Sequence, residues 1–356
     1  MPPNLKQATA AALAAAPPPL QYDQLVTVPG AAFCRALTYA FGKLWACTQR
    51  TALVVADPMD LSKNQLVPLP QSDMIGYDIC VINGKLYVTC QSSMARVVEV
   101  DPVSLLAREV LVDPDLVNEG PGPANATDGT SLFVLPYGSG MGGPAEFSRL
   151  AKYDPTTFRR VATRDLMGLT RGNALDFNPA TGRLSATAIV DSVPSQFIEI
   201  DPASLDYVSS PFPDGCLNAS DDLAFVGTDT WTGVETSQDV FKWGADMTLS
   251  RIPTAVTTGA CWGLFNVGGL LLQVLAADPG IIQLIDPANP VPTAMRPYTL
   301  PVRNPNEAVA LPDGSIVVAC MTNPLALLKF RPNASADTPV PAFRRGSDLV
   351  VPGIFH

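Results

Sequence analysis

Four polar side chains stand at matching places in four similar segments of the chain, where they could act together. Arg35, Asp78, Asn173 and Glu307 directly precede Ala-Leu, Ile-Cys, Ala-Leu and Ala-Val, and Asp214 joins them from a further segment. Carboxylate and amide oxygens are the ligands that hard divalent cations prefer. A cation held by such a group could polarise a carbonyl and activate water for hydrolysis.

Arg35 favours a structural role for this group of residues. A guanidinium would repel a metal cation and would instead pair with Asp78 or Glu307. The sole histidine is the last residue, His356, so a Ser-His-Asp arrangement is excluded. We therefore expect an Arg–carboxylate lining at the mouth of a central channel, with a ligand or metal site as the alternative, and we assign no catalytic residue, metal ligand or cofactor.

A second candidate group lies in the segment GTDTWTGVETSQDVFKW, which contains Asp229, Trp231 and Glu235. An aromatic ring among carboxylates suits contact with a carbohydrate or a protein surface. The alternative is an ordinary strand hairpin with Trp243 in the core. We keep the three residues as candidates for surface contact.

Seven cysteines show no paired spacing and no C-x-x-C motif. Most of them sit in apolar runs such as LWACT and IVVAC, where a free cysteine behaves as a small buried hydrophobe. We therefore expect free thiols rather than disulfides or a zinc site.

The elements that must position these residues follow from a repeat. A turn with Gly or Asp, an alternating apolar strand and a second strand ending near Asp-Pro recur seven times, and the Asp-Pro is intact at Asp57, Asp101, Asp154, Asp201 and Asp286. Gly244 and Arg331 occupy the equivalent place in the fifth and seventh copies, and the spacing is 42 to 53 residues. This spacing matches a four-stranded propeller blade.

We therefore predict an all-β protein, a seven-bladed β-propeller of four-stranded blades. Asp ends a strand by accepting hydrogen bonds from backbone N–H groups ahead of it, and Pro sets the turn, so these aspartates are turn residues and not catalytic acids. The predicted blades span residues 30–70, 72–112, 120–166, 171–212, 214–254, 259–300 and 305–345.

The stretch NPNEAVALPDGSIVVACMTNPLALLKF and the recurrent IDP and VDP strand exits resemble the YVTN and NHL-type families of seven-bladed propellers. The resemblance covers about residues 30 to 345 as a pattern. It implies the fold alone, because members of these families have different functions.

Both ends of the chain depart from the repeat. Residues 1–20 form an Ala- and Pro-rich arm that reads poorly as a secretory signal, and residues 21–28 form a strand that could close the ring, as could the C-terminal segment. We expect the arm to dock on a protein partner, and a mobile tail is the alternative. The third blade carries a Gly-rich insert, YGSGMGGPAEF.

Composition limits the partners. The net charge is −10 without a basic cluster, which argues against nucleic acid, and no apolar stretch is long enough to cross a membrane. We expect a soluble, non-catalytic propeller that serves as a structural or interaction module in a larger assembly, in one specific form a bacteriophage virion or tail component. The alternatives are a metal-dependent, lactonase-like hydrolase at the channel mouth and a carbohydrate-binding module, so a small-molecule or glycan ligand stays open.

Overall fold

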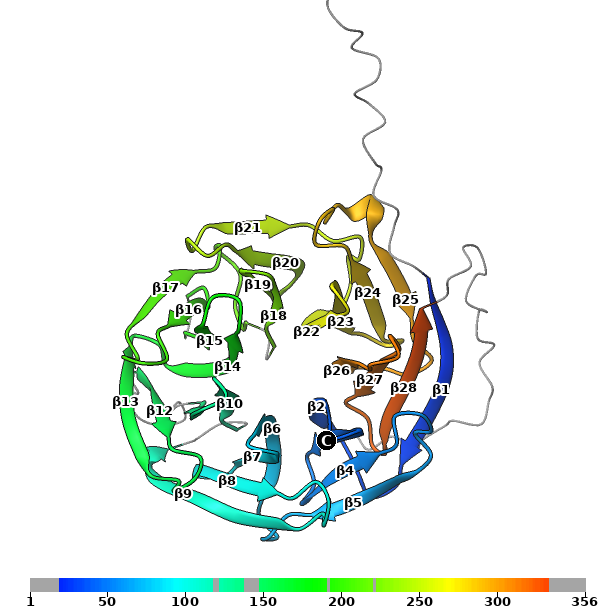
Figure 1. The fold of residues 1–356 in the computed structure, drawn as a ribbon. Coiled ribbons are helices and arrows are strands. Elements are labelled where there is room, and N and C mark those ends of the chain that lie inside the picture. The colour runs from blue at the N-terminus through cyan, green and yellow to red at the C-terminus, as the bar shows by residue number, and fades with distance from the viewer. Residues whose placement is uncertain (1–18, 118–121, 138–146, 191–192, 220–221, 333–356) are drawn as a thin grey trace, which may run out of the picture.

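The chain forms seven four-stranded antiparallel sheets, arranged as blades around a ring (Figure 1). The computed structural model describes residues 19–117, 122–137, 147–190, 193–219 and 222–332. The predicted arm up to residue 18, most of the blade-three insert and the C-terminal segment after residue 332 lie outside these residues. The seven-bladed all-β fold predicted from the repeat is confirmed.

Each blade runs from an innermost to an outermost strand. Blade one contains β2 (Cys34–Ala40), β3 (Lys43–Thr48), β4 (Ala52–Ala56) and β5 (Asn64–Pro68), and blade two contains β6 (Ile75–Ile82), β7 (Lys85–Gln91), β8 (Met94–Val100) and β9 (Ala107–Val117). Blade three contains β10 (Ala124–Thr127), β11 (Leu132–Leu135), β12 (Phe147–Tyr153) and β13 (Arg160–Met167), and blade four contains β14 (Arg171–Asn178), β15 (Arg183–Ile189), β16 (Gln196–Ile200) and β17 (Tyr207–Pro211).

The remaining blades follow the same order. Blade five contains β18 (Ala224–Val226), β19 (Asp229–Val234), β20 (Ser237–Trp243) and β21 (Leu249–Ile252), and blade six contains β22 (Ala260–Val267), β23 (Leu270–Ala276), β24 (Ile281–Ile285) and β25 (Arg296–Thr299), with a 3-10 turn at Pro292–Ala294. Blade seven contains β26 (Pro305–Ala310), β27 (Ile316–Cys320), β28 (Leu325–Pro332) and, as its outermost strand, β1 (Leu20–Val28).

The ring is closed by the beginning of the chain. β1 runs antiparallel to β28, with Leu20 opposite Pro332 and Val28 opposite Leu325. The backbone N–H of Leu20 also donates to the hydroxyl of Tyr298 in blade six, at 2.9 Å. β1 therefore begins inside the segment that the sequence assigned to the arm, and it joins the last blade to the start of the chain.

The Asp-Pro turns connect the third and fourth strands of their blades. The carboxylate of Asp101 accepts the N–H groups of Val103 and Ser104, both at 2.9 Å, and the other aspartates of the repeat act in the same way: Asp57, Asp154, Asp201 and Asp286. The turn chemistry predicted for this dipeptide is confirmed. In blade five, which lacks the dipeptide, Asp246 accepts the N–H of Thr248 instead.

Three of these turns end on an apolar residue in the left-handed region. Leu105, Phe158 and Leu205 have φ values of 60°, 53° and 60°. This conformation costs about 1–2 kcal/mol for a residue with a Cβ. Burial of the side chain offsets the cost: Leu205 is 1% exposed, and the Phe158 ring lies 5.7 Å from that of Tyr87.

The hydrophobic core is divided among the junctions between blades. Seven clusters of buried residues each combine side chains from two adjacent blades, so every blade is held mainly by its neighbours. The junction between blades four and five is aromatic, with Phe197 and Phe212 4.5 and 4.7 Å from Trp243 between ring centroids. Among the described residues, no helix has the length and apolar character to span a membrane.

Lys329, on β28, has a fully buried side chain at the junction of blades seven and one. Its Nζ donates to the carbonyl oxygen of Pro58 at 2.7 Å and lies 3.8 Å from Oδ2 of Asp313. Methionine would keep the length of the side chain but would leave the carbonyl without this donor. We expect Lys329→Met to lower the free energy of unfolding by about 1–3 kcal/mol, measured by urea denaturation.

Lys63→Met is the control, because Lys63 forms an exposed ion pair with Asp60 at 3.6 Å. Exposed pairs contribute about 0–1 kcal/mol. Equal effects of the two substitutions would show that the Lys329 contact does not stabilise the junction.

Candidate functional site

The starts of the innermost strands share a local irregularity. In five blades the pairing between the first and second strands slips by one residue, and the residue passed over is Arg35, Tyr77, Asn173, Trp262 or Asn306. Such a bulge re-aims the side chains around it. Arg35 and Asn173 therefore occupy equivalent positions, as the sequence predicted, whereas Asp78 and Glu307 lie one residue further along their strands.

Arg35 does not form the predicted pair with Asp78 or Glu307. Its guanidinium lies over the ring of Tyr77, 5.8 Å from the centroid, and its Nε donates to the side-chain oxygen of Gln49 at 2.8 Å when that amide is turned to face it. The bulge explains the difference, because Tyr77 of blade two, and not Asp78, occupies the position equivalent to Arg35.

Two further candidates, Asp78 and Asn173, connect adjacent blades, and so does Asn306, the residue before the candidate Glu307. Asp78 accepts the backbone N–H of Asn125 in blade three at 2.8 Å, and Asn173 donates to the carbonyl of Ala219, before blade five, at 2.6 Å. Asn306 donates to the carbonyl of Cys34 in blade one at 3.1 Å and to Glu307 at 3.0 Å. The channel mouth is thus a belt of polar contacts from blade to blade.

Asp214 does not belong to this belt, and its assignment from the sequence was wrong. It lies exposed in the turn after β17, whereas the innermost strand of blade five is β18, which begins ten residues later at Ala224. Asp222, just before β18, is a carboxylate that lies beside the innermost strand of the next blade, β22. Its Oδ2 is so close to Gly263 of that strand that a Cβ added to this glycine would lie 2.7 Å from it. The DD pair in NASDDLAF was the sequence signal for it.

Trp231 cannot serve as a surface contact. It lies in β19 with only 1% of its surface exposed and packs in the junction of blades five and six. Trp243, which the hairpin alternative placed in the core, is also buried. Asp229 pairs with Lys242 of the neighbouring strand at 3.0 Å, and Glu235 lies in the turn after β19, 3.5 Å from the side-chain nitrogen of Asn218. The three residues therefore do not form one contact surface.

Asp176, which the sequence analysis did not select, is exposed on the innermost strand β14. Desolvation by the surrounding protein raises its pKa to about 7, against a hydrogen bond from the N–H of Phe177 that lowers it, and the charge of Asp78 adds a smaller increase. Cys80 lies near both aspartates, and burial with these charges raises the pKa of its thiol.

Asp176 should make stability depend on pH. Its carboxyl holds a proton more tightly in the folded chain than in the unfolded chain, where the pKa is about 3.9, so the stability present at low pH is lost as the pH rises through about 7. We expect Asp176→Asn to raise the urea midpoint at pH 8 and to leave it unchanged at pH 4. Asp214→Asn, in its exposed turn, controls for the lost charge, and an equal gain at both pH values would contradict the prediction.

The cysteines are free, as predicted, and all but Cys80 are buried. Burial raises the pKa of the Cys261 thiol to about 12. Within the described ranges, no three His, Cys, Asp or Glu side chains are grouped so that they could hold a metal ion.

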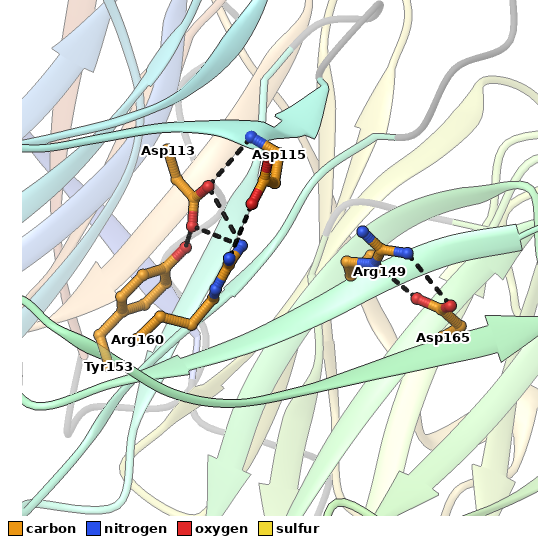
Figure 2. A network of polar contacts seen from close by, with 6 residues as sticks. All are labelled: Asp113, Asp115, Arg149, Tyr153, Arg160 and Asp165. Carbon is orange, nitrogen blue, oxygen red and sulfur yellow. Dashed lines mark hydrogen bonds and ion pairs between the residues drawn. The ribbon is translucent and has the colours of Figure 1, made fainter.

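A polar network on the outer side of the ring joins blades two and three (Figure 2). Asp113 of β9 accepts the hydroxyl of Tyr153 at 2.6 Å and lies 3.2 Å from the Arg160 guanidinium, which also bonds Asp115 at 2.7 Å. Burial raises the pKa of Tyr153, and so does Asp113, so the hydroxyl keeps its proton and donates. Nearby, Arg149 and Asp165 form a separate pair across β12 and β13 with contacts of 2.5 and 3.2 Å.

Solved structures share this fold, although neither a family model nor a curated protein matches the chain. A virginiamycin B lyase from Staphylococcus aureus superposes with a TM-score of 0.67 at 11% identity, covering 88% of this chain and 99% of its own. A streptogramin B lyase gives a TM-score of 0.67 at 13% identity, covering 87% and 98%. The Pan2 WD40 domain of Neurospora crassa gives 0.69 at 10%, covering 89% and 96%. At such low identity the likeness is one of fold, and the chain is a seven-bladed β-propeller.

Proposed function

We propose that the chain is a non-catalytic interaction propeller, a closed ring that serves as a module in a larger assembly. The observation that carries this proposal is the belt of contacts at the channel mouth. Asp78, Asn173 and Asn306 each bond to an adjacent blade, so their polar atoms are used in holding the ring together. A ring in which these residues hold adjacent blades together presents its outer strands and turns to partners.

The structural relatives include both lyases and a WD40 domain, so the fold alone does not choose between catalysis and interaction. The glycan-binding alternative depended on an accessible Trp231, and that side chain is buried. The hydrolase alternative depends on Asp78, Asn173 and Glu307 acting on a ligand. The contacts of Asp78 and Asn173 with adjacent blades, and the bond from Asn306 to Glu307, favour the scaffold role.

Cross-linking of the full chain in an extract of its source, followed by mass spectrometry, tests the proposal. We expect recurrent cross-links from the outer strands to one partner protein. A purified chain that carries a stoichiometric divalent ion and hydrolyses lactones or esters, with the activity lost in a folded Glu307→Gln variant, would contradict the proposal.

A further inference from the structure

A groove of about 360 Å³ lies on the outer side of blade three. Its lining comes from the last two strands of blade three and from the first residue of β17 in blade four: Arg149, Thr163, Arg164, Asp165, Met167 and Tyr207. Three of these residues, Thr163 to Asp165, are consecutive in β13. Because successive side chains of a strand point to opposite faces, a groove lined by all three must run along the edge of the strand.

β13 is the outermost strand of its blade and pairs on one side, with β12, among the described strands. The N–H of Met167 points away from β12, because it donates to the hydroxyl of Tyr207 at 3.0 Å. The pairing with β12 is regular from Met167 back to Thr163, so the N–H groups of Asp165 and Thr163 point the same way. The edge is therefore a template for one more strand.

The side chains along this edge favour a negatively charged occupant. The residues that line the groove include two arginines and one aspartate, in a chain whose net charge is −10. Arg149 is fixed by two contacts with Asp165 (Figure 2), and Arg164 lies 3.3 Å from Asp206 and over the Tyr207 ring. Both guanidinium groups are partly exposed and held in place, which suits recognition of carboxylates.

Apolar side chains flank the charges. Met167 is 58% exposed at one end of the strand, and Val161 is 62% exposed near the other. An occupant with acidic residues and an apolar residue at either end would match this pattern. The groove follows β13 from Thr163 to Met167, so about five residues of an extended segment would fit.

We propose that the outer edge of β13 is the docking site for an extended acidic segment of a partner protein, which adds to blade three as a fifth strand. Backbone hydrogen bonds to Thr163 and Asp165 would hold the segment, and Arg149 and Arg164 would select its acidic side chains. The inference rests on the proposed interaction role, because it names the surface and the chemistry of the partner.

Panning a random library of displayed 12-residue peptides against the full chain tests the proposal. We expect the enriched sequences to be rich in Asp and Glu. A synthetic peptide from this set, followed by fluorescence anisotropy, should bind at least ten-fold more weakly to the Arg149→Glu/Arg164→Glu variant and more weakly as salt is raised. Thr163→Pro, which removes an outward N–H, should weaken binding as well.

Arg251→Glu is the matched control, because Arg251 on the outermost strand of blade five pairs with Asp239 at 2.5 Å as Arg149 pairs with Asp165. It should bind the peptide like the unmodified chain, and circular dichroism should show that all variants are folded. Enriched peptides that bind the double variant equally well would overturn the β13 site while leaving the interaction role intact. A library that yields no binding sequence would count against both.

Discussion

A chain that lacks residues 1–28 is expected to lose the closed ring and the cooperative unfolding transition that goes with it. The deletion removes β1, whose eight pairs with β28 complete the seventh blade. It also uncovers two junction cores, because Leu20 and Val28 are buried in the clusters that join blade seven to blades six and one. Two buried side chains contribute about 1.5–3 kcal/mol each, and together with the lost strand pairing this is comparable with the usual stability of about 5–15 kcal/mol.

Deletion of residues 1–18 is the control, since it stops before β1. This shorter deletion should leave the circular dichroism spectrum and the thermal midpoint unchanged, whereas the longer one should elute as an expanded or aggregated species in size-exclusion chromatography. A chain without residues 1–28 that melts cooperatively at the original temperature would show that β1 is dispensable. The same shorter deletion tests whether the arm docks on a partner, since it would then abolish assembly.

Asp113→Ala is expected to lower the free energy of unfolding by about 2–4 kcal/mol. The Asp113 side chain is 8% exposed and joins blades two and three through Tyr153 and Arg160. Without the carboxylate, the buried Tyr153 hydroxyl loses its hydrogen-bond acceptor. Arg160 loses one of its ion pairs and retains the one with Asp115. An unsatisfied buried polar group costs about 1–3 kcal/mol, and losing a partner of a buried ion pair costs more.

Asp165→Ala is the comparison, because Asp165 forms a more exposed pair with Arg149 a short distance away (Figure 2). We expect it to cost less than about 1 kcal/mol. Urea denaturation at pH 7 measures both. If the two substitutions cost the same, the network around Asp113 does not hold the blades together.

The blade repeat could be predicted because its signals are local. The Asp-Pro turn acts within a few residues, as the bonds from Asp101 to Val103 and Ser104 show, so it appears in the sequence wherever it appears in the fold. Alternating apolar strands that recur between such turns at this spacing are typical of the blades of a β-propeller. Blade five, which lacks the dipeptide, is where the assignment of the innermost strand failed, and Asp214 was misplaced with it.

The geometry of the channel mouth depended on contacts that the sequence does not display. A bulge near Arg35, Asn173 or Asn306 arises from pairing with a second strand, and it decided that Tyr77 rather than Asp78 is equivalent to Arg35. The stack of Arg35 on Tyr77 and the bond from Asn173 to Ala219 join segments 42 and 46 residues apart. The residue types in the sequence indicated a group of polar residues at the channel mouth. Which partner each of them contacts depends on the pairing register of the strands.

The network around Asp113 was also missed, although the sequence carried a hint. Asp113-Pro114 is an Asp-Pro dipeptide that falls outside the sevenfold spacing, so it was not needed as a repeat turn. In the structure it lies within the long strand β9, and its carboxylate points to the next blade. The Asp-Pro dipeptide at this position, which does not fit the repeat spacing, therefore contributes a contact between blades instead of a repeat turn.

Closure of the ring by β1 has a consequence for synthesis. β1 pairs with β28, which follows it about 300 residues later in the chain. At about 5–20 residues per second, the nascent chain must keep β1 unpaired for roughly 15–60 s. Gln21, Asp23 and Thr27 are exposed on this strand and only its two end residues are buried, so the unpaired strand is a poor template for aggregation. β1 can therefore take its place in the last blade only after β28 has been synthesised.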